Sequence, residues 1–267
     1  MIVFPNAKIN IGLNVINKRA DGYHNLETVF YPVKIHDALE VILSDHLSFT
    51  SSGINIPGNP ENNLCLKAYQ LIKTDYDLPL VSIHLHKNIP IGAGLGGGSA
   101  DCGFFIKLLN ELCQLGLSAE TMQNYARKLG ADCAFFIDNK PVFAFEKGDQ
   151  FEDVALDLSS YYLVLVMPPV HVSTAEAYGG VQPKSAEFNL KSALKFPIQE
   201  WKNRIKNDFE LSVFQHHPQI LSVKEALYEN GALYAAMSGS GASVFGIFSK
   251  KPDLQELEQA NQVFYDI

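Results

Sequence analysis

The sequence has little of several features that mark particular classes of protein. Only four of its 267 residues are cysteines, Cys65, Cys102, Cys113 and Cys133, and no two of them form the Cys-x-x-Cys pair of zinc and redox sites. Lys and Arg number 21 against 29 Asp and Glu, a net charge of -8, and no basic cluster is present that could neutralise a nucleic-acid backbone. These absences argue against a secreted disulfide scaffold and a nucleic-acid partner, and they indicate a reducing, cytoplasmic compartment.

Long hydrophobic runs are also missing. The longest apolar stretch, residues 161–170, is about half the length of a membrane-spanning helix and contains Pro168-Pro169. The first residues lack the basic start, apolar core and cleavage site of a signal peptide, so we expect a chain that is mature from Met1 and does not enter a membrane. With 47% hydrophobic and 19% charged residues, the sequence is typical of a folded globular protein, long enough for two domains that meet near residues 150–158.

Hydrophobic periodicity predicts a mixture of strands and helices. Alternating or clustered β-formers indicate strands, and apolar residues at helical spacing indicate helices. The expected elements are short strands at 7–15 and 39–43, a helix at 62–74, a strand at 81–86, a helix ending at Gly116, a helix from Ser118 to Gly130, a hairpin of 135–137 with 142–145, a strand at 161–167, a helix near 220–233 and a strand at 244–248. This mixture predicts an α/β protein.

A glycine-rich segment carries the first functional signal. Five glycines occupy the seven positions from Gly92 to Gly98, between a predicted strand and a predicted helix. Such density is entropically unfavourable unless the backbone must approach something closely or adopt positive φ. Bare backbone N–H groups next to a helix N-terminus form a binding site for an anion such as phosphate. A plain turn or linker is the structural alternative, but linkers are unusual between a strand and an amphipathic helix, and we therefore interpret the segment as a phosphate loop.

Three well-known nucleotide loops fit this segment poorly. The spacing Gly92-x-Gly94-x-x-Gly97 satisfies the dinucleotide fingerprint, yet the region about 20 residues downstream is helix and turn, with no acidic residue ending a strand. A Walker A loop needs Gly-Lys-Ser or Gly-Lys-Thr, whereas Ser99 follows Gly98 directly. The His-Arg-Asp and Asp-Phe-Gly segments of protein kinases are absent. A different class of ATP-dependent kinase remains.

Three segments, in this order, resemble the motifs of the GHMP kinases: 5–13, 91–100 and 238–242. The order and spacing match over nearly the whole chain. The resemblance implies an α/β (α+β) fold of two domains, with an N-terminal ATP-binding domain at residues 1–152 and a C-terminal ferredoxin-like α+β domain at 153–267. It also implies phosphoryl transfer from ATP, with Mg²⁺ carried by the nucleotide, to an alcohol group of a small molecule.

Three further segments resemble one branch of this family more closely. They are 19–24, the triple glycine 96–98 and 129–133. The branch phosphorylates the 2-hydroxyl of 4-diphosphocytidyl-2-C-methyl-D-erythritol, a step of the non-mevalonate pathway to isoprenoid precursors. The resemblance therefore implies this small-molecule substrate.

The same resemblance assigns the site residues. The catalytic pair is Lys8 and Asp132, and the substrate-binding residues are Asn10, which supports that pair, and Tyr23, His24 and Tyr178, which contact the cytidine. The residues that bind the nucleotide are Asn63 and Lys87, near adenine, and the loop residues Pro90, Ile91, Gly92, Ala93, Gly94, Leu95, Gly96, Gly97, Gly98, Ser99 and Ala100. The segment 207–210 resembles one near the active-site entrance, whereas Cys102-Gly103-Phe104 departs from the alanine-rich helix start usual in the family.

Phosphoryl transfer needs positioning, neutralisation of charge and, late in the reaction, an acceptor for the hydroxyl proton. We expect the loop to hold the phosphates and Asp132 to orient the hydroxyl and take its proton, with Lys8 between Asp132 and the developing charge. Each assignment has a structural alternative: Asp132 could cap a helix turn, Lys8 could be a solvated strand residue, and Tyr23 and His24 could decorate a turn.

Other functions remain open at this level. His84 and His86 share one face of a strand without a third ligand nearby, and we expect no protein-ligated metal there or at His216-His217. The alternative functions are another GHMP kinase, of the homoserine or mevalonate type, which should lack the Gly-Tyr-His segment, and a catalytically silent nucleotide-binding protein, which should have lost Lys8 or Asp132. We expect a monomer or a weak homodimer.

Overall fold

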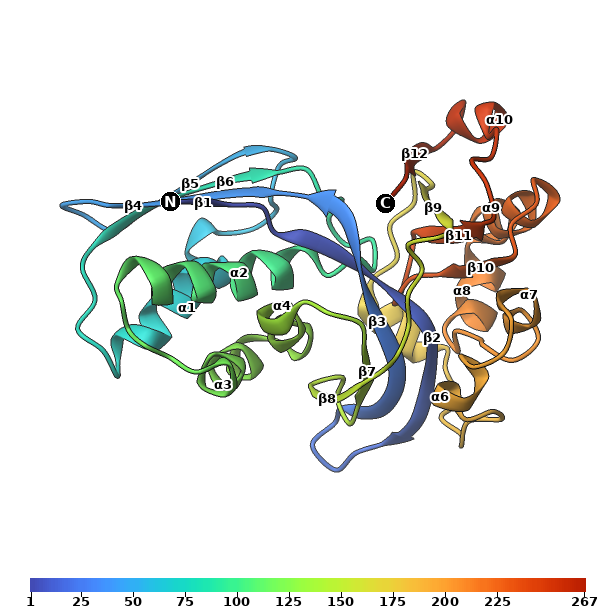
Figure 1. Cartoon of the computed structure of the whole chain (residues 1–267), viewed down its shortest axis with the longest axis horizontal. Coiled ribbons are helices and arrows are strands. Elements are labelled where there is room, and N and C mark those ends of the chain that lie inside the picture. Colours follow the sequence, from blue (N-terminus) through green and yellow to red (C-terminus); the bar gives the residue numbers. More distant parts are fainter. The chain divides into compact units, whose positions relative to one another are not determined.

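The computed structural model describes every residue from Met1 to Ile267 (Figure 1). Its strands are β1 Ile2–Val3, β2 Asn6–Lys18, β3 His24–His36, β4 Ala38–Leu43, β5 Ser48–Gly53, β6 Val81–Lys87, β7 Val142–Phe145, β8 Gln150–Asp153, β9 Tyr162–Met167, β10 Tyr234–Met237, β11 Val244–Phe248 and β12 Gln262–Tyr265. Its α-helices are α1 Leu64–Lys73, α2 Gly97–Leu112, α3 Ala119–Leu129, α4 Phe135–Asp138, α5 Thr174–Gly179, α6 Leu190–Ala193, α7 Ile198–Trp201, α8 Glu210–His216, α9 Pro218–Glu229 and α10 Gln255–Glu258, and its 3₁₀ helices are η1 Pro60–Asn62 and η2 Ala131–Ala134.

Packing separates the chain into two compact units. Unit 1 consists of Met1–Lys8, Lys34–Ile91 and Gly96–Lys140, and unit 2 consists of Ile9–Val33, Gly92–Leu95 and Pro141–Ile267. Because β2, β3 and the glycine loop each run from one unit into the other, the chain crosses this boundary several times. The division by packing therefore differs from the single domain boundary expected at residues 152–153.

Unit 1 is a four-stranded sheet covered by helices. The strand order is β1-β4-β6-β5, with β5 parallel to β6 and the other pairs antiparallel. Alternate side chains of β6, those of Val81, Ile83 and Leu85, are buried, as expected for a sheet with one covered face. Figure 1 shows α1 to α4 on the same side of this sheet, and α2 packs against α1 and β4. The long amphipathic helix that follows the glycine loop thereby becomes part of the core of unit 1.

The limits predicted for the helix from Ser118 to Gly130 are confirmed by its caps, whereas the helix predicted to end at Gly116 ends at Leu112. α2 starts directly after Gly96, whose φ of 69° is left-handed, and α3 starts after Ser118, whose side chain accepts a hydrogen bond from the backbone of Thr121. The strand predicted at 135–137 is wrong, because these residues form α4, which follows η2 without a break. Three consecutive buried apolar side chains do not distinguish a strand from one turn of a buried helix. The hairpin in this region instead joins β7 to β8.

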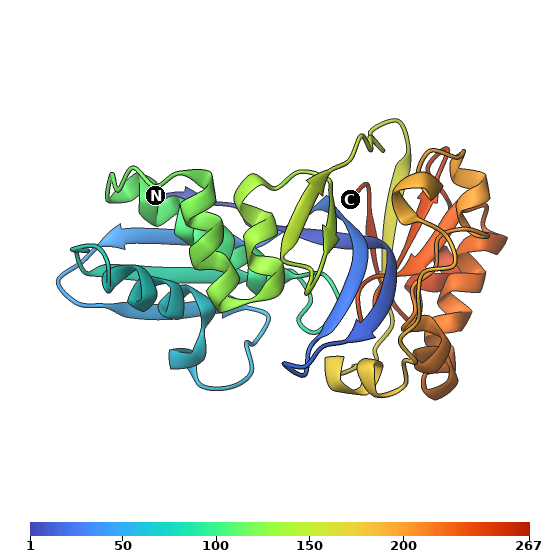
Figure 2. The ribbon, with the colours of Figure 1, turned by 90° about the horizontal axis from the view of Figure 1, so that it is seen from below.

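Unit 2 contains two sheets. One is antiparallel with the order β10-β11-β9-β12, and α9 packs on β10 and β11, in agreement with the expected α+β domain. The other has the order β2-β3-β7-β8 (Figure 2). β2 and β3 are 13 residues each, longer than the short strands predicted near the N-terminus. No helix in either unit has the length and apolar character needed to cross a lipid bilayer.

The packing of α2 explains the residue that departs from the family's usual helix start. A β-carbon on Gly103 would lie 2.7 Å from Cβ of Phe136 and 2.9 Å from the carbonyl oxygen of Cys133. A β-carbon on Gly98, in the same helix, would meet no atom within 4 Å. Gly103 thus allows α2 to approach η2 and α4 closely.

We predict that Gly103→Ala destabilises the protein by about 1–3 kcal/mol, because the added methyl group overpacks the contact with α4. The expected fall in Tm is roughly 2–4 °C for each kcal/mol. Gly98→Ala is the matched control and should leave Tm unchanged or slightly raised, since alanine has the higher helix propensity. Thermal unfolding followed by circular dichroism measures both, and equal Tm values for the two variants would contradict this packing.

Candidate active site

Lys8 and Asp132, predicted as a pair from distant segments, lie together in unit 1. The Lys8 Nζ atom, on β2, is 3.3 Å from Oδ2 of Asp132, on η2. The lysine side chain is 4% exposed and the aspartate side chain 33% exposed. The lysine is therefore held in the interior, while the carboxylate stays accessible to a substrate.

The start of α2 lies next to this pair. A β-carbon on Gly96 would be 3.0 Å from Cε of Lys8, so the absence of a side chain at this position gives the lysine its space. Gly96 also supplies no capping side chain, and Gly98, in the first turn, is exposed. The first N–H groups of a helix have no intrahelical acceptor and carry partial positive charge. Lys8, Asp132 and an uncapped helix N-terminus are thus neighbours in unit 1.

The first half of the glycine loop is held by the third predicted motif, within unit 2. The Ser238 hydroxyl donates to the carbonyl oxygen of Gly94 at 2.9 Å, and the Ser243 hydroxyl donates to that of Ala93. A β-carbon on Gly94 would be 2.0 Å from the carbonyl oxygen of Ser238. Glycine is therefore required at 94 by this approach as well as by its φ of 76°.

Two asparagines hold the segment around this motif in place. The backbone N–H of Asn10 donates to the Ser238 hydroxyl at 3.2 Å, and its side-chain amide donates to Thr28 at 2.9 Å. The amide of Asn207 donates to the carbonyl oxygens of Met237 and Gly239, both at 2.8 Å. The predicted family segment at 207–210 is thus a support for the third motif.

Two of the predicted cytidine contacts meet in unit 2. The rings of His24 and Tyr178 stack with centroids 4.8 Å apart and planes inclined by 21°. The ring of Phe209 also meets that of Tyr178 edge-on, with centroids 4.8 Å apart and planes inclined by 77°. Sequence reasoning missed Phe209, although it lies inside the predicted segment 207–210.

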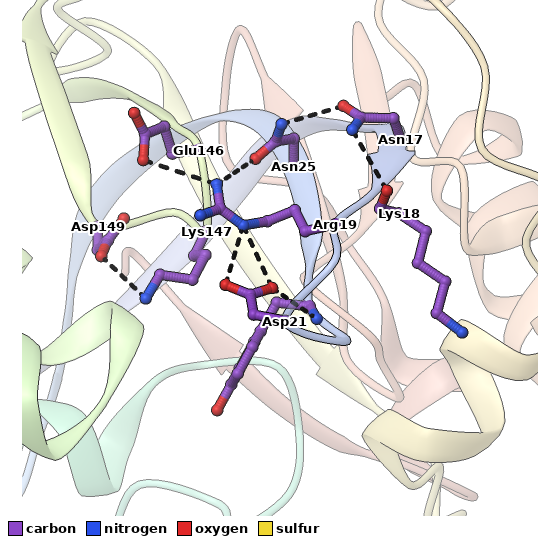
Figure 3. A network of polar contacts seen from close by, with 9 residues as sticks. Asn17, Lys18, Arg19, Asp21, Asn25, Glu146, Lys147 and Asp149 are labelled. Atoms are coloured by element: carbon purple, nitrogen blue, oxygen red, sulfur yellow. Dashed lines mark hydrogen bonds and ion pairs between the residues drawn. The ribbon is translucent and has the colours of Figure 1, made fainter.

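Tyr23, the third predicted contact, lies at the tip of the hairpin that joins β2 to β3. The residue is 63% exposed, and its backbone N–H donates to Asp21. Figure 3 shows Arg19 at the centre of a polar network. Its guanidinium group donates to the carboxylate of Asp21 and, at 2.8 Å, to Oδ1 of Asn25. It also lies 3.7 Å from the carboxylate of Glu146, on the hairpin that joins β7 to β8. The Nζ atom of Lys147, on the hairpin that joins β7 to β8, lies over the Tyr23 ring, 5.4 Å from its centroid.

The two residues predicted near adenine have structural partners. The side chain of Asn63 caps α1 by accepting from the backbone N–H of Cys65 at 2.9 Å. Lys87 is 3% exposed, and its Nζ lies between the carboxylates of Asp37 and Asp101, 2.7 Å from the latter. Contact of Lys87 with adenine would require its ammonium group to leave both carboxylates.

Asp37 and Asp101 were not predicted as site residues. Asp101 lies on the buried face of α2, where a charged residue breaks the apolar pattern, and that break was the available signal. Burial raises the pKa of Asp101 to about 7, against the lowering effect of Lys87 and with a further rise from the charge of Asp37. For Lys87, burial lowers the pKa, but the two carboxylates outweigh it and the pKa is raised.

No cluster of three or more His, Cys, Asp or Glu side chains in the structure could hold a metal ion. His84 is within hydrogen-bond distance of Thr50 and Ser52, and His86 of Ser52, on the exposed face of β5 and β6. His217 contacts Glu176, and His216 contacts the carbonyl oxygen of Ser212. These histidines have hydrogen-bond partners on the protein itself.

Known proteins are similar to this chain over nearly its whole length. Residues 63–140 match the family described as GHMP kinases N terminal domain, and residues 190–266 match GHMP kinases C terminal. A protein of Parabacteroides distasonis named 4-diphosphocytidyl-2-C-methyl-D-erythritol kinase is 55% identical, over 96% of this chain and 94% of its own. A protein of the same name from Bacteroides thetaiotaomicron is 51% identical, over 99% and 98%.

Solved structures resemble the chain over its full length. A crystal structure of 4-(cytidine 5'-diphospho)-2C-methyl-D-erythritol kinase aligns with a TM-score of 0.84 and 28% identity, covering 99% of this chain and 98% of that one. A homoserine kinase from Cytophaga hutchinsonii aligns with a TM-score of 0.65 and 17% identity, covering 98% and 94%. The second similarity concerns the fold alone.

We predict that the buried carboxyl of Asp101 makes the free energy of unfolding fall between about pH 4 and pH 7. Its pKa of about 7 in the folded protein exceeds the ordinary value of 3.8, so over this range the folded state holds a proton that the unfolded state has released. A group that binds more protons in the folded state loses stabilisation as the pH rises. Urea unfolding at pH 5 and pH 7.5 measures the change.

In Asp101→Asn this contribution disappears, and the unfolding free energy should fall less between the two pH values than in the wild type. Asp157→Asn is the control: Asp157 is exposed, and a hydrogen bond from the backbone of Ser159 lowers its pKa, so it stays ionised across the range. Identical pH dependence in the wild type and Asp101→Asn would contradict the prediction.

Proposed function

The chain belongs to the GHMP kinase family, and from this we propose that it transfers the γ-phosphoryl group of ATP to the 2-hydroxyl of 4-diphosphocytidyl-2-C-methyl-D-erythritol. The observation that carries the proposal is the accessible carboxylate of Asp132, paired with Lys8 at 3.3 Å beside the uncapped start of α2. The acceptor is supported by full-length relatives that are more than 50% identical and bear the name of this kinase.

The glycine loop and the start of α2 would bind the phosphates of ATP. Support comes from the three left-handed glycines Gly92, Gly94 and Gly96, which shape the loop, and from exposed Gly98, where no side chain blocks approach to the helix N-terminus. Backbone N–H groups in this position bind phosphate oxygens, and the helix dipole favours their negative charge. The predicted contacts of Asn63 with adenine remain part of this proposal.

Asp132 would accept a hydrogen bond from the acceptor hydroxyl and so aim its oxygen at the γ-phosphorus atom. As the new P–O bond forms and the bond to ADP breaks, the hydroxyl proton would pass to Oδ1 or Oδ2 of Asp132. Lys8, buried in the space that Gly96 leaves, would place its ammonium group beside the carboxylate and the charge that develops on the transferred group. Both residues act by position and charge, without a covalent intermediate.

Mg²⁺ bound to ATP would neutralise phosphate charge during the transfer. Such an ion would be held mainly by the phosphate oxygens and by water. Four cysteines without a disulfide support the reducing, cytoplasmic location that we propose with this function.

The aromatic residues of unit 2 would bind the cytosine ring. Tyr23 offers an exposed ring for stacking, and His24, aligned by its stack on Tyr178, offers ring nitrogens for hydrogen bonds to a pyrimidine. Asn10 would support the site from β2, where its own side chain is held by Thr28. A homoserine or mevalonate acceptor has no ring to use these groups.

We expect the purified protein to release ADP when given ATP, Mg²⁺ and 4-diphosphocytidyl-2-C-methyl-D-erythritol, and to release little with homoserine or mevalonate. A coupled assay for ADP measures all three reactions, and ³¹P NMR of the product identifies the phosphorylated oxygen. ADP release with homoserine or mevalonate alone would replace the proposed acceptor, and no release with any acceptor would overturn the kinase function.

We predict that Asp132→Asn lowers kcat at least roughly 100-fold, because the amide can neither take the proton nor supply the negative charge that orients the hydroxyl. The dissociation constant for ATP should change little, since Asp132 is not among the groups proposed to bind phosphate. Asp138→Asn is the matched control. Asp138 is an exposed residue of α4 with no role in the proposed site, so this variant should retain full activity. Unchanged turnover in Asp132→Asn would refute the assignment.

A further inference from the structure

We propose that Asp37, Lys87 and Asp101 form a buried clamp that joins the two stems of the glycine loop and thereby fixes the ATP phosphate site. The three are positioning residues, because none of them reaches the reacting atoms in this arrangement. The inference rests on the proposed function, in which this loop binds ATP.

Asp37 holds the stem that enters the loop. It directly precedes β4, and its Oδ1 atom accepts the backbone N–H groups of Asn88 at 2.6 Å and Ile89 at 2.8 Å. Its Oδ2 atom accepts from the Nζ of Lys87. The last residue of β6 and the two residues that follow it are thus tied to one carboxylate, immediately before the loop starts at Pro90.

Lys87 carries the connection across to the stem that leaves the loop. Its Nζ donates to Oδ2 of Asp101, in the second turn of α2, at 2.7 Å. A β-carbon on Gly97 would be 3.0 Å from Nζ of Lys87 and 2.9 Å from a methyl group of Ile89. The glycine at the first position of α2 therefore lets the entering stem pack directly beneath the helix N-terminus.

Burying three charged side chains is an unusual way to stabilise a fold. All three residues are at most 3% exposed, and replacing a buried ion pair by apolar residues is often neutral or favourable for stability. What an apolar core would not provide is a fixed hydrogen-bonded distance between the end of β6 and the first turns of α2. The loop between these points contains three glycines, Gly92, Gly94 and Gly96, and has little conformational preference of its own. Fixing both ends keeps its N–H groups in one arrangement before ATP arrives, which reduces the ordering required on binding.

The carboxylates of Asp37 and Asp101 make different hydrogen bonds, and this difference provides the test. Both oxygens of Asp37 accept hydrogen bonds, so an asparagine there must place an NH₂ group against either the Lys87 ammonium or the backbone N–H groups. Asp101 accepts through Oδ2 alone, and its buried Oδ1 has no partner. An asparagine at 101 can keep its oxygen on Lys87 and turn its NH₂ group toward the unpartnered position.

The experiment measures the dissociation constant for MgATP by isothermal titration calorimetry without acceptor, at a temperature well below Tm, on wild type, Asp37→Asn, Asp101→Asn and Asp101→Ala. We expect Asp37→Asn and Asp101→Ala to weaken ATP binding by roughly tenfold, because the loop loses one of its two anchors. Asp101→Asn should restore affinity to within about twofold of the wild type, because the hydrogen bond to Lys87 is kept. Steady-state kinetics should show the same loss in KM for ATP and little change in KM for the acceptor.

Ile72→Val is the control for a general loss of stability, since it removes one buried methylene from α1 in the same unit without touching either stem. It should lower Tm and leave ATP affinity unchanged. If Asp37→Asn does not fold, the contrast between Asp101→Ala and Asp101→Asn decides the question. Wild-type affinity in folded Asp101→Ala, or equal losses in Asp101→Ala and Asp101→Asn, would overturn the clamp. Failure of the wild type to bind MgATP would instead overturn the proposed kinase function.

Discussion

The close approach of other groups to the backbone of the glycine loop is the constraint on which the rest of the site depends. On one side Gly94 lies against the carbonyl oxygen of Ser238, and on the other Gly96 lies against the side chain of Lys8. A β-carbon at either position would meet atoms at 2.0 Å and 3.0 Å. The glycines are therefore needed both for their positive φ values and for the space they leave.

The charged side chains of unit 1 differ in how far they are exposed to solvent. Lys8 is buried while Asp132 is one-third exposed, so the pair combines a fixed positive charge with a carboxylate that a substrate can reach. Lys87 and its two carboxylates are almost completely buried, and their hydrogen bonds go to each other and to backbone N–H groups. The carboxylate of Asp132 is thus accessible, whereas the carboxylates around Lys87 are held in the interior by directional hydrogen bonds.

Unit 2 uses hydrogen bonds of the same kind to hold its half of the loop. Ser238 and Ser243 donate to the loop carbonyls, and Asn207 in turn holds the carbonyls on both sides of Ser238. The aromatic side chains His24 and Tyr178 belong to this unit as well. The third motif is thus a support for the loop, in addition to any contact it makes with ATP.

Local patterns in the sequence determined a large part of this description. The glycine loop, the start of α2 after it and the Ser118 cap of α3 depend on backbone conformation and on hydrogen bonds within a few residues, and such features can be predicted from the chain alone. The resemblance to a known family added the pairing of Lys8 with Asp132. Where a short apolar run had no local signal, as at 135–137, the prediction of a strand failed.

Tertiary structure decided what local patterns could not express. Asp37, Lys87 and Asp101 are separated by 50 and 14 residues, and no periodicity reports that their charges converge. The same holds for the stack of His24 on Tyr178 and for the contact of Gly94 with Ser238. The sequence by itself determined where the glycine loop lies and which helix follows it, because those properties are set by neighbours in the chain. Which side chains share a site was decided by folding, because burial and hydrogen bonding act on neighbours in space.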